Sequence, residues 1–506
     1  MAAGRAGSLP ILALLFTACA PSSPERPVVN AAEVSIHGTW SDDGKVASFL
    51  GIPFAAPPVG PRRWREPEAP IPAPQIEATR FAAACMQGPH MVDWYKKLVA
   101  DFAGDPESFP VPEFSEDCLY LNVWTPQAAA DAKLPVMVWI HGGSHRGGWS
   151  YEPNYMGEQL ARKGVVVVSI AYRLDVFGFF SHPELDISNF GLLDQVAALR
   201  WVQGNVGNFG GDKDNVTVFG ESAGAASIGF LLASPQAGGL FAKAIHQSAG
   251  YELVNIDTRE QFVDEGIALE REVLAGNGES GIDALRDASA KVLLAGAKKI
   301  FADYQPDVVV DGASVPDVLR NSLDQGELHA VQLLVGSNAD EWLMYLDAKS
   351  SDADLQKQAD EYAFSERKAI LGELERESSV LRKLDRLITA REFVCPSLML
   401  AADARDRGRS AYVYYFDRVR PGAEAAAIGA YHGAEIPYVF NTHDAWLPTA
   451  DRDIEISLAM MRYWVSFART GNPNTVGLPE WPLFSARGAE TLQIGDTIRA
   501  VRHPEA

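Results

Sequence analysis

The fold is decided by the stretch Gly220-Glu221-Ser222-Ala223-Gly224, which follows the apolar run Val216 to Phe219 and precedes an alanine-rich segment. The apolar run predicts a buried strand, and the alanine-rich segment predicts a helix. The two glycines between them allow the backbone to turn sharply and hold Ser222 at a strained, exposed position. Gly-x-Ser-x-Gly is common by chance, but a position between strand and helix is the context in which it presents a nucleophile. We therefore predict that Ser222 is a nucleophile.

Elements on either side of this turn indicate the fold class. Two apolar runs, Leu134 to Ile140 and Gly164 to Ile170, predict strands that are buried on both faces of a sheet. Apolar residues recur at helical spacing between Leu192 and Val206. Residues 258–300 and 352–406 are rich in helix-favouring residues, so they predict helical excursions that cover the sheet. The expected class is α/β, with a large, mostly parallel central sheet and helices on both faces.

An activated serine needs donors that are already aimed at the oxyanion it creates. Upstream, Trp139-Ile140-His141-Gly142-Gly143-Ser144 follows a predicted buried strand, and its glycines leave backbone N–H groups free to point into a pocket. We assign the oxyanion donors to Gly143, Ser144 and Ala223. His141, at the end of the strand, is interpreted as a residue that fixes the loop.

The base and its acid partner are expected downstream, because the chain order in this type of site is serine, acid, histidine. The apolar strand Val331 to Val335 leads into a loop with two adjacent carboxylates, Asp340 and Glu341. His432 comes after both acids, inside a glycine-containing loop. The residues alone leave open which carboxylate serves His432. This chemistry needs no cofactor, and no metal-ligand cluster is visible in the sequence.

The composition limits the kind of partner. The chain has 506 residues, of which 47% are hydrophobic and 22% charged, enough to bury a large core. We read residues 33–506 as a single catalytic domain. With 44 basic and 66 acidic residues, the net charge is −22, which repels the phosphates of nucleic acids. A role in nucleic-acid binding is therefore excluded, and the acidic surface is expected to keep the protein in solution.

The N-terminus has the pattern of a targeting segment. Arg5 precedes an apolar run from Leu9 to Phe16, which is too short to span a bilayer. We predict a signal peptide over residues 1–19, with Cys19 lipidated as in bacterial lipoproteins, so that the enzyme is anchored to a membrane. Cleavage by an ordinary signal peptidase is the alternative. Residues 20–32 predict a proline-rich linker, and in either case the mature protein is expected outside the cytoplasm of a bacterium.

Three cysteines remain when Cys19 is set aside: Cys85, Cys118 and Cys395. An oxidising compartment favours one disulfide. Cys85 and Cys118 are nearest in sequence and bracket a loop with proline and glycine, so we pair them and expect Cys395 to be a buried thiol. Three reduced cysteines in the core would fit such a compartment less well.

Taken together, these stretches resemble the type-B carboxylesterase and cholinesterase family, in particular bacterial esterases of the para-nitrobenzyl esterase type. The resemblance extends from about residue 32 to residue 495. It is carried by Gly51-Ile52-Pro53-Phe54-Ala55, Ser115-Glu116-Asp117-Cys118-Leu119, the loop at His141, Asn189-Phe190-Gly191-Leu192-Leu193-Asp194-Gln195, the turn at Ser222 and Gln247-Ser248-Ala249-Gly250.

The resemblance implies an α/β-hydrolase fold and a serine carboxylic-ester hydrolase. In this family the second carboxylate of the Asp-Glu pair serves the histidine, which implies that Glu341 is the acid and that Asp340 is structural. The resemblance also supports the pairing of Cys85 with Cys118. It further implies a structural ion pair between Arg63 and Glu116.

The chain departs from the family directly after the glycine loop. Ser144 stands where relatives often have a glycine or alanine, and His145 and Arg146 follow where relatives usually have uncharged residues. We assign both to substrate binding, since a guanidinium there could pair with a carboxylate on the substrate. The alternative is that Arg146 faces solvent or pairs with a surface acid. Neither Trp94 nor Tyr95 aligns with the choline-binding tryptophan of cholinesterases, so choline-ester specificity does not carry over.

The expected function is hydrolysis of a small-molecule carboxylic ester through a triad of Ser222, His432 and Glu341. An acyltransferase or amidase could use the same triad. A non-catalytic binding protein on this fold is the rival from another class, but such proteins typically lose the nucleophile. The sequence specifies neither the acyl chain nor the oligomeric state.

Overall fold

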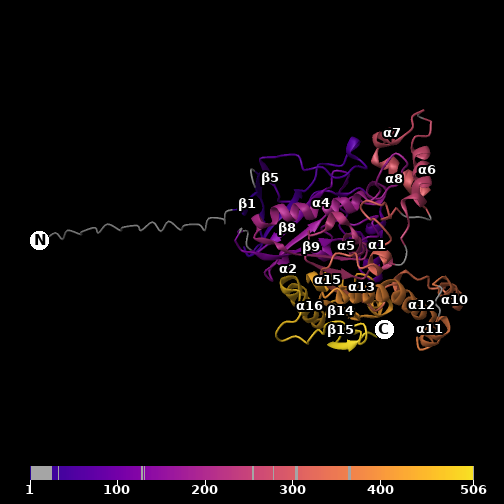
Figure 1. The fold of residues 1–506 in the computed structure, drawn as a ribbon. Coiled ribbons are helices and arrows are strands. Elements are labelled where there is room, and N and C mark those ends of the chain that lie inside the picture. The colour runs from indigo at the N-terminus through magenta and orange to yellow at the C-terminus, as the bar shows by residue number, and fades with distance from the viewer. Residues whose placement is uncertain are drawn as a thin grey trace.

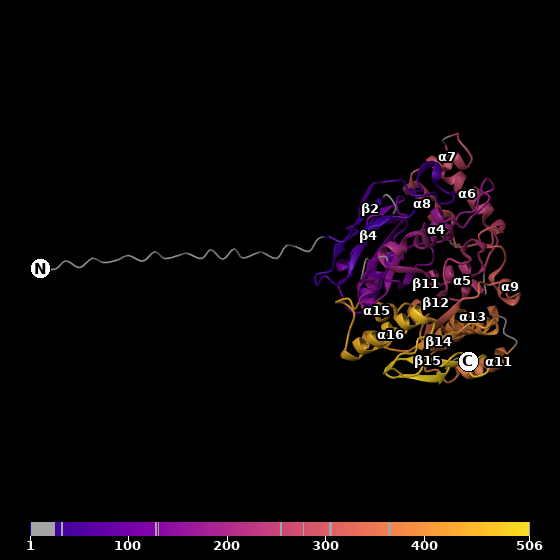
Figure 2. The same ribbon diagram turned by 60° about the vertical axis from the view of Figure 1, so that its left-hand side comes forward.

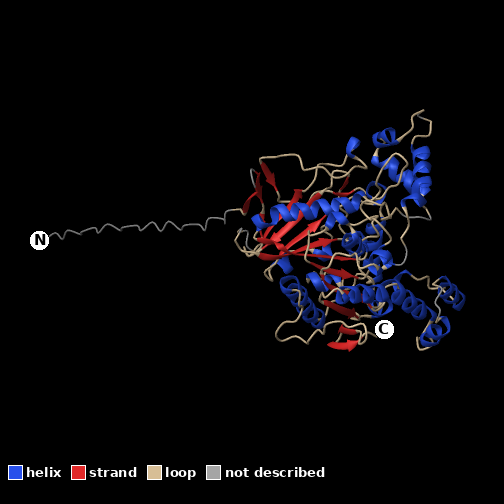
Figure 3. Ribbon diagram, viewed as in Figure 1, coloured by secondary structure: helices blue, strands red, loops and turns tan. Residues whose placement is uncertain are grey.

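The computed structural model describes residues 1, 26–31, 34–126, 129, 131–253, 256–276, 278–302, 306–362 and 366–504. Within this part of the chain, an 11-stranded sheet forms the centre of the molecule (Figure 3). Its strands are β3 (Thr39–Trp40), β4 (Ala47–Pro53), β8 (Tyr120–Thr125), β9 (Leu134–Ile140), β10 (Val166–Ile170), β11 (Gly211–Glu221), β12 (Lys243–Gln247), β13 (Gln332–Asn338), β14 (Ala411–Phe416), β15 (Glu490–Ile494) and β16 (Ile498–Arg502).

The sheet is mostly parallel, as predicted. Its order is β3-β4-β8-β10-β9-β11-β12-β13-β14-β15-β16. Every neighbouring pair from β10 to β15 is parallel, whereas β8, β4 and β3 at one edge and β16 at the other pair antiparallel. The second predicted strand begins at Val166 rather than at residue 164, because Gly164 has a positive φ of 85° that an extended strand does not adopt.

Strand β9 shows why its sequence is apolar at every position. Val136, Val138 and Ile140 lie in the core on one face of the sheet. Met137 and Trp139, which alternate with them, lie in the core on the other face. Because successive strand side chains point to opposite faces, a strand covered by helices on both sides must be apolar throughout.

Helices cover both faces, as predicted (Figure 1). Residues of α4 (Phe190–Asn205), α5 (Ala223–Ala233) and α13 (Cys395–Asp406) contribute to the first core. Residues of α15 (Ile436–Phe440) and α16 (Asp451–Thr470) contribute to the second. Five further helices are α1 (His90–Asp101), α2 (Glu158–Ala161), α3 (Asp175–Gly178), α9 (Leu319–Asp324) and α14 (Ala423–Ile428).

Two groups of helices form the predicted excursions, and both lie toward the right-hand side of Figures 1 and 2. The first group is α6 (Val263–Val273), α7 (Ile282–Asp287) and α8 (Ala290–Ile300); the second is α10 (Asp352–Glu361), α11 (Arg367–Leu374) and α12 (Val380–Thr389). Each has its own small apolar core, which includes Leu269 and Leu293 in the first group and Leu355 and Leu384 in the second. A short π-helix, Ala390–Val394, joins α12 to α13.

The ordered fold begins earlier than the predicted linker allows. Strand β1 (Val28–Ala31) pairs antiparallel with β2 (Val34–His37), and β2 pairs with β5 (Gln75–Glu77). Val29 and Ala31 are buried, so the apolar residues here belong to the fold and not to a tether. Cys19 lies outside the described residues. None of the described helices combines the length and the apolar character of a membrane-spanning segment.

Candidate active site

A cavity of about 480 Å3 lies where strands β11 and β12 end. Ser222 directly follows β11, Ser248 directly follows β12, and both line the cavity. The carboxyl ends of parallel strands are where α/β proteins place their ligand sites. Aromatic side chains form much of the remaining wall: Trp94, Tyr95, Tyr155, Tyr251, Trp342, Tyr345 and Phe393.

Ser222 occupies the sharp turn between β11 and α5, with φ 55° and ψ −129°. A non-glycine residue in this region is strained, and such strain is concentrated at functional sites. The flanking glycines are required sterically. A Cβ on Gly220 would lie 2.7 Å from the carbonyl oxygen of Ile140, and one on Gly224 would lie 2.1 Å from it. This close contact with strand β9 explains the two glycines of the motif.

His432 and Glu341 lie together at the same cavity. His432 lines it, and the Nδ1 atom of the imidazole lies 2.7 Å from Oε2 of Glu341. Glu341 is fully buried, and its Oε1 atom accepts the backbone N–H of Asn338 at 2.6 Å. Both carboxylate oxygens are therefore held, which orients the imidazole.

The neighbouring carboxylate, Asp340, has a different environment. It forms an ion pair with Arg382 on α12 and accepts the backbone N–H of Ala430 at 2.8 Å. Its contacts join the second excursion to the segment that leads to His432. The structure thus separates the two adjacent acids, one at the imidazole and one at an arginine.

The sequence reasoning assigned no role to Glu221, although it lies inside the motif. Its Oε1 atom lies 3.3 Å from Nε2 of His432, and its side chain lines the cavity. Burial raises the pKa of Glu221 well above its ordinary value, and the charges of Glu435 and Glu341 add to this, while His432 opposes it. The signal that could have indicated Glu221 is its place directly before the nucleophile.

The imidazole of His432 binds a proton more tightly than a free histidine does. Burial alone would lower its pKa, but the carboxylates of Glu221 and Glu341 outweigh burial and raise it to about 9. A general base acts in its neutral form. The geometry therefore predicts that the base form of His432 becomes more available as the pH rises.

The glycine loop lies against the turn at Ser222. Gly143, Ser144 and His145 have φ values of 105°, 56° and 54°, so three successive residues are left-handed. In the described part of the chain, the N–H groups of Gly143 and Ser144 have no hydrogen-bond acceptor. Both residues line the cavity, as does Ala223 at the start of α5. The three predicted oxyanion donors thus line the same cavity.

The structure does not bring His145 and Arg146 to the cavity. The His145 ring is fully buried, with Nε2 2.8 Å from the hydroxyl of Ser227 and Nδ1 2.5 Å from Oδ1 of Asp307. Arg146 is half-buried, and neither residue is among those that line the cavity. The left-handed turn carries both side chains away from the site that the sequence suggested for them.

The cysteine pairing is confirmed by a disulfide between Cys85 and Cys118, with Cα atoms 4.9 Å apart. The loop that it closes contains α1, which supplies His90, Met91, Trp94 and Tyr95 to the cavity wall. The ion pair of Arg63 with Glu116 is also present, at 2.6 Å. The prediction for Cys395 is wrong, because its thiol is exposed. The residues on either side of it, Val394 and Pro396, are buried instead.

Two polar networks hold the segment that carries His432. In the first, Asn338 donates to Glu435 at 2.6 Å and to the carbonyl of Tyr431 at 2.8 Å, while Gln247 donates to Glu435 at 3.0 Å. These bonds tie the ends of β12 and β13 to the His432 loop. All of them are buried, so they are strong and directional.

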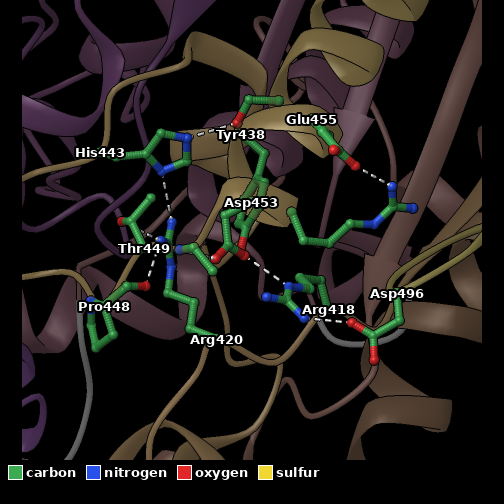
Figure 4. A network of polar contacts seen from close by, with 12 residues as sticks. Arg418, Arg420, Tyr438, His443, Pro448, Thr449, Asp453, Glu455 and Asp496 are labelled. Atoms are coloured by element: carbon green, nitrogen blue, oxygen red, sulfur yellow. Dashed lines mark hydrogen bonds and ion pairs between the residues drawn. The ribbon is translucent and has the colours of Figure 1, made fainter.

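The second network fixes the helices that follow His432 (Figure 4). Asp453, on α16, accepts from Arg418 at 2.7 Å and from the hydroxyl of Tyr438 on α15 at 2.6 Å. Arg420 donates to the carbonyl of Pro448 and to Thr449, and its other nitrogen lies 3.1 Å from His443. The network joins the segment after β14 to α15 and α16.

Comparison with known proteins shows what the whole chain is related to. The model of the carboxylesterase family matches residues 25–505. The chain is 34% identical to the para-nitrobenzyl esterase of Bacillus subtilis over 91% of its length and 94% of that protein. It is 35% identical to the liver carboxylesterase of Sus scrofa, over 95% of its length and 91% of that protein.

Solved structures agree with this relationship. A structure of PNB esterase, 31% identical in sequence, superposes with a TM-score of 0.80 and covers 95% of this chain and 98% of that one. A thermophilic PNB esterase superposes with a TM-score of 0.79 over the same shares. These matches confirm the α/β-hydrolase fold that the sequence predicted. The chain belongs to the carboxylesterase family and is a carboxylic-ester hydrolase.

Proposed function

We propose that the chain hydrolyses esters through a covalent acyl-enzyme on Ser222, with His432 as general base and Glu341 as its acid partner. The observation that carries this proposal is the 2.7 Å contact between His432 and Glu341 at the wall of the cavity that Ser222 also lines. A carboxylate at Nδ1 fixes the tautomer in which Nε2 can accept a proton, and it stabilises the imidazolium that forms.

The reaction has two halves. The Ser222 hydroxyl attacks the ester carbonyl carbon and gives its proton to Nε2 of His432, while the N–H groups of Gly143, Ser144 and Ala223 stabilise the oxyanion. The tetrahedral intermediate expels the alcohol, which takes the proton from His432. Water then attacks the acyl-enzyme with the same base, and this step releases the carboxylic acid and restores Ser222.

The acyl-enzyme can be tested directly. A fluorophosphonate probe should label the protein at Ser222, and a chromogenic ester should give a burst of alcohol before the steady state if deacylation is slower than acylation. Peptide mapping that placed the label on another residue would contradict the proposal. Rates with an ester, an amide of the same shape and an added alcohol acceptor would measure how far amidase or acyltransferase activity accompanies hydrolysis.

We also propose that the mature enzyme lies outside the cytoplasm, anchored through a lipid on Cys19. The support is the pattern of residues 1–19 in the sequence. Mass spectrometry of the N-terminal peptide, from protein isolated from membranes of a bacterial host, should show a lipid-modified cysteine. An N-terminus at Pro21 would instead indicate cleavage after Ala20 and a protein without an anchor.

A further inference from the structure

Asp307 presents a carboxylate on the cavity wall that has no part in the chemistry described above. Its side chain lines the cavity and is 34% exposed. Its Oδ1 atom accepts the backbone N–H of Val308 at 2.7 Å and lies 2.5 Å from Nδ1 of His145. In the described part of the chain, no group donates to Oδ2. One oxygen of Asp307 is therefore anchored, and the other is available to a ligand.

Two hydrogen-bonding contacts fix the ring of His145. Gln195 donates its amide N–H to the Ser227 hydroxyl at 3.0 Å, and the hydroxyl lies 2.8 Å from Nε2 of His145. The Nδ1 edge of the ring thus lies on Asp307, and the Nε2 edge lies on a buried hydroxyl. His145 therefore holds Asp307 in place.

Asp307 faces a cavity whose charged groups are mostly acidic. No lysine or arginine is among the described residues that line the cavity. Besides Asp307, the acids there are Glu152 and Glu221, and both are buried. Burial raises the pKa of Glu152 to about 7 and that of Glu221 well above its ordinary value. Among the described acids that line the cavity, Asp307 is the one that is partly exposed to solvent.

The rest of the wall also suits a cation. The rings of Trp94, Trp342 and Tyr345 line the same cavity. The face of an aromatic ring attracts an ammonium group, most strongly for tryptophan. A substrate carboxylate, by contrast, would meet Asp307 in a cavity whose described basic lining residues are His90 and His432, with no lysine or arginine to balance it.

We propose that Asp307 is a specificity-determining residue, which binds a cationic nitrogen of the ester and favours ammonium-bearing esters over neutral esters of the same shape. This inference rests on the proposed function, because the ester must bind in the cavity of Ser222. It reverses the preference for acidic esters that the sequence suggested from Arg146. The ammonium can belong to the acyl half or to the alcohol half of the ester, and the test separates these two cases.

The test compares esters that differ only in charge. The acyl pair is the p-nitrophenyl esters of 4-(trimethylammonio)butyrate and 5,5-dimethylhexanoate. The alcohol pair is 2-(trimethylammonio)ethyl acetate and 3,3-dimethylbutyl acetate. For each pair, the ratio of kcat/KM for the charged ester to that for the neutral ester is measured in the wild type and in Asp307→Asn. Asparagine keeps an oxygen for Nδ1–H of His145 and removes the charge.

In Asp307→Asn the ratio should fall about tenfold in at least one pair, which is the size expected for a partly exposed charge pair at a binding site. The pair in which it falls identifies the half of the ester that carries the ammonium. Glu327→Gln is the matched control, because this substitution also removes one negative charge. Glu327 is exposed and does not line the cavity. Unchanged ratios, or an equal loss for both members of a pair, would overturn the inference and leave Asp307 as a support for His145.

A binding experiment decides the inference independently of catalysis. The variant Ser222→Ala and the double variant Ser222→Ala/Asp307→Asn are titrated with each charged ester by calorimetry. Binding of one charged ester should be about tenfold weaker in the double variant. Equal affinities would refute the role of Asp307 even if the enzyme cleaves both pairs. Failure of the wild type to cleave any of the four esters would instead refute the proposed function, and the titration would still report on Asp307.

Discussion

The molecule contains two clusters that each combine a serine, a histidine and an acid. Their serines are five positions apart, one at the turn after β11 and one in helix α5. The elbow cluster is Ser222, His432 and Glu341, and the helix cluster is Ser227, His145 and Asp307. In both, Nδ1 of the histidine lies within hydrogen-bonding distance of a carboxylate. In the helix cluster, the serine also lies 2.8 Å from the second ring nitrogen.

The clusters differ in where the serine stands. Ser222 occupies a strained turn and lines the cavity, whereas Ser227 lies inside α5 and is fully buried. No ester carbonyl can reach a hydroxyl inside a packed helix. Under the proposed mechanism, a serine, a histidine and an acid near one another are not enough for catalysis. The backbone must also expose the oxygen beside preformed oxyanion donors.

The largest effect should separate the two serines. Ser222→Ala removes one oxygen at the cavity wall, so we expect a loss of kcat by roughly a million-fold with the fold retained. Labelling by a fluorophosphonate should also disappear. Esterase assays measure the loss of kcat, and circular dichroism checks that the fold is retained. Ester hydrolysis near the wild-type rate in this variant would refute the mechanism.

Ser227→Ala is the matched change in the helix cluster. It leaves Nε2 of His145 without a donor and the amide of Gln195 without an acceptor, so it should destabilise the fold by about 1–3 kcal/mol. Labelling at Ser222 should remain. Denaturant unfolding gives the loss of stability, and a loss of labelling in the folded variant would show that the two clusters are not independent.

The acid of the elbow cluster should be the second most sensitive position. Glu341→Gln removes the charge that stabilises the imidazolium, so kcat should fall by roughly a thousand- to ten-thousand-fold. Asp340→Asn weakens an ion pair with Arg382 and should be far less damaging. The comparison is made by steady-state kinetics on both variants. The reverse asymmetry would assign the acid to Asp340.

The disulfide closes the loop that contains α1, which lines the cavity beside the elbow cluster. It spans 33 positions of sequence, and on the chain-entropy model a loop of this size contributes about 3–4 kcal/mol. Cys85→Ala/Cys118→Ala should lower the melting temperature measured by calorimetry. Because α1 lies in this loop and lines the cavity, the variant should show a larger rise in KM than fall in kcat. An unchanged melting temperature would show that packing alone holds the loop.

The smallest effect concerns pH. Glu221 carries the carboxylate next to Nε2 of His432 and helps to raise the pKa of this histidine to about 9. Glu221→Gln removes that stabilisation of the imidazolium, so the pKa of His432 should fall and the neutral base should persist at lower pH. The acid limb of the kcat/KM profile should therefore move to lower pH. A limb that moved to higher pH, or stayed in place, would show that another group controls it.

Much of the fold was accessible from the sequence, because its signals are local. The apolar runs at β9 and β11 and the glycines beside Ser222 are short patterns, and backbone geometry and burial on both faces leave few alternatives for them. The disulfide was accessible for the same reason, since the two cysteines bracket one loop. The exposure of Cys395 was not, because it depends on which side of α13 faces the core.

For the elbow cluster, the flanking pattern predicted Ser222 and the order of residues along the chain predicted His432. The choice between Asp340 and Glu341 was open from the residues alone, and it was the resemblance to a family that favoured Glu341. In the structure, Glu341 lies at the imidazole and Asp340 at Arg382. The contacts of Glu221 with His432 and of Asp307 with His145 join residues that are far apart in sequence. These contacts arise from the tertiary structure, because electrostatic and hydrogen-bonding energies depend on distances in space that no local pattern encodes.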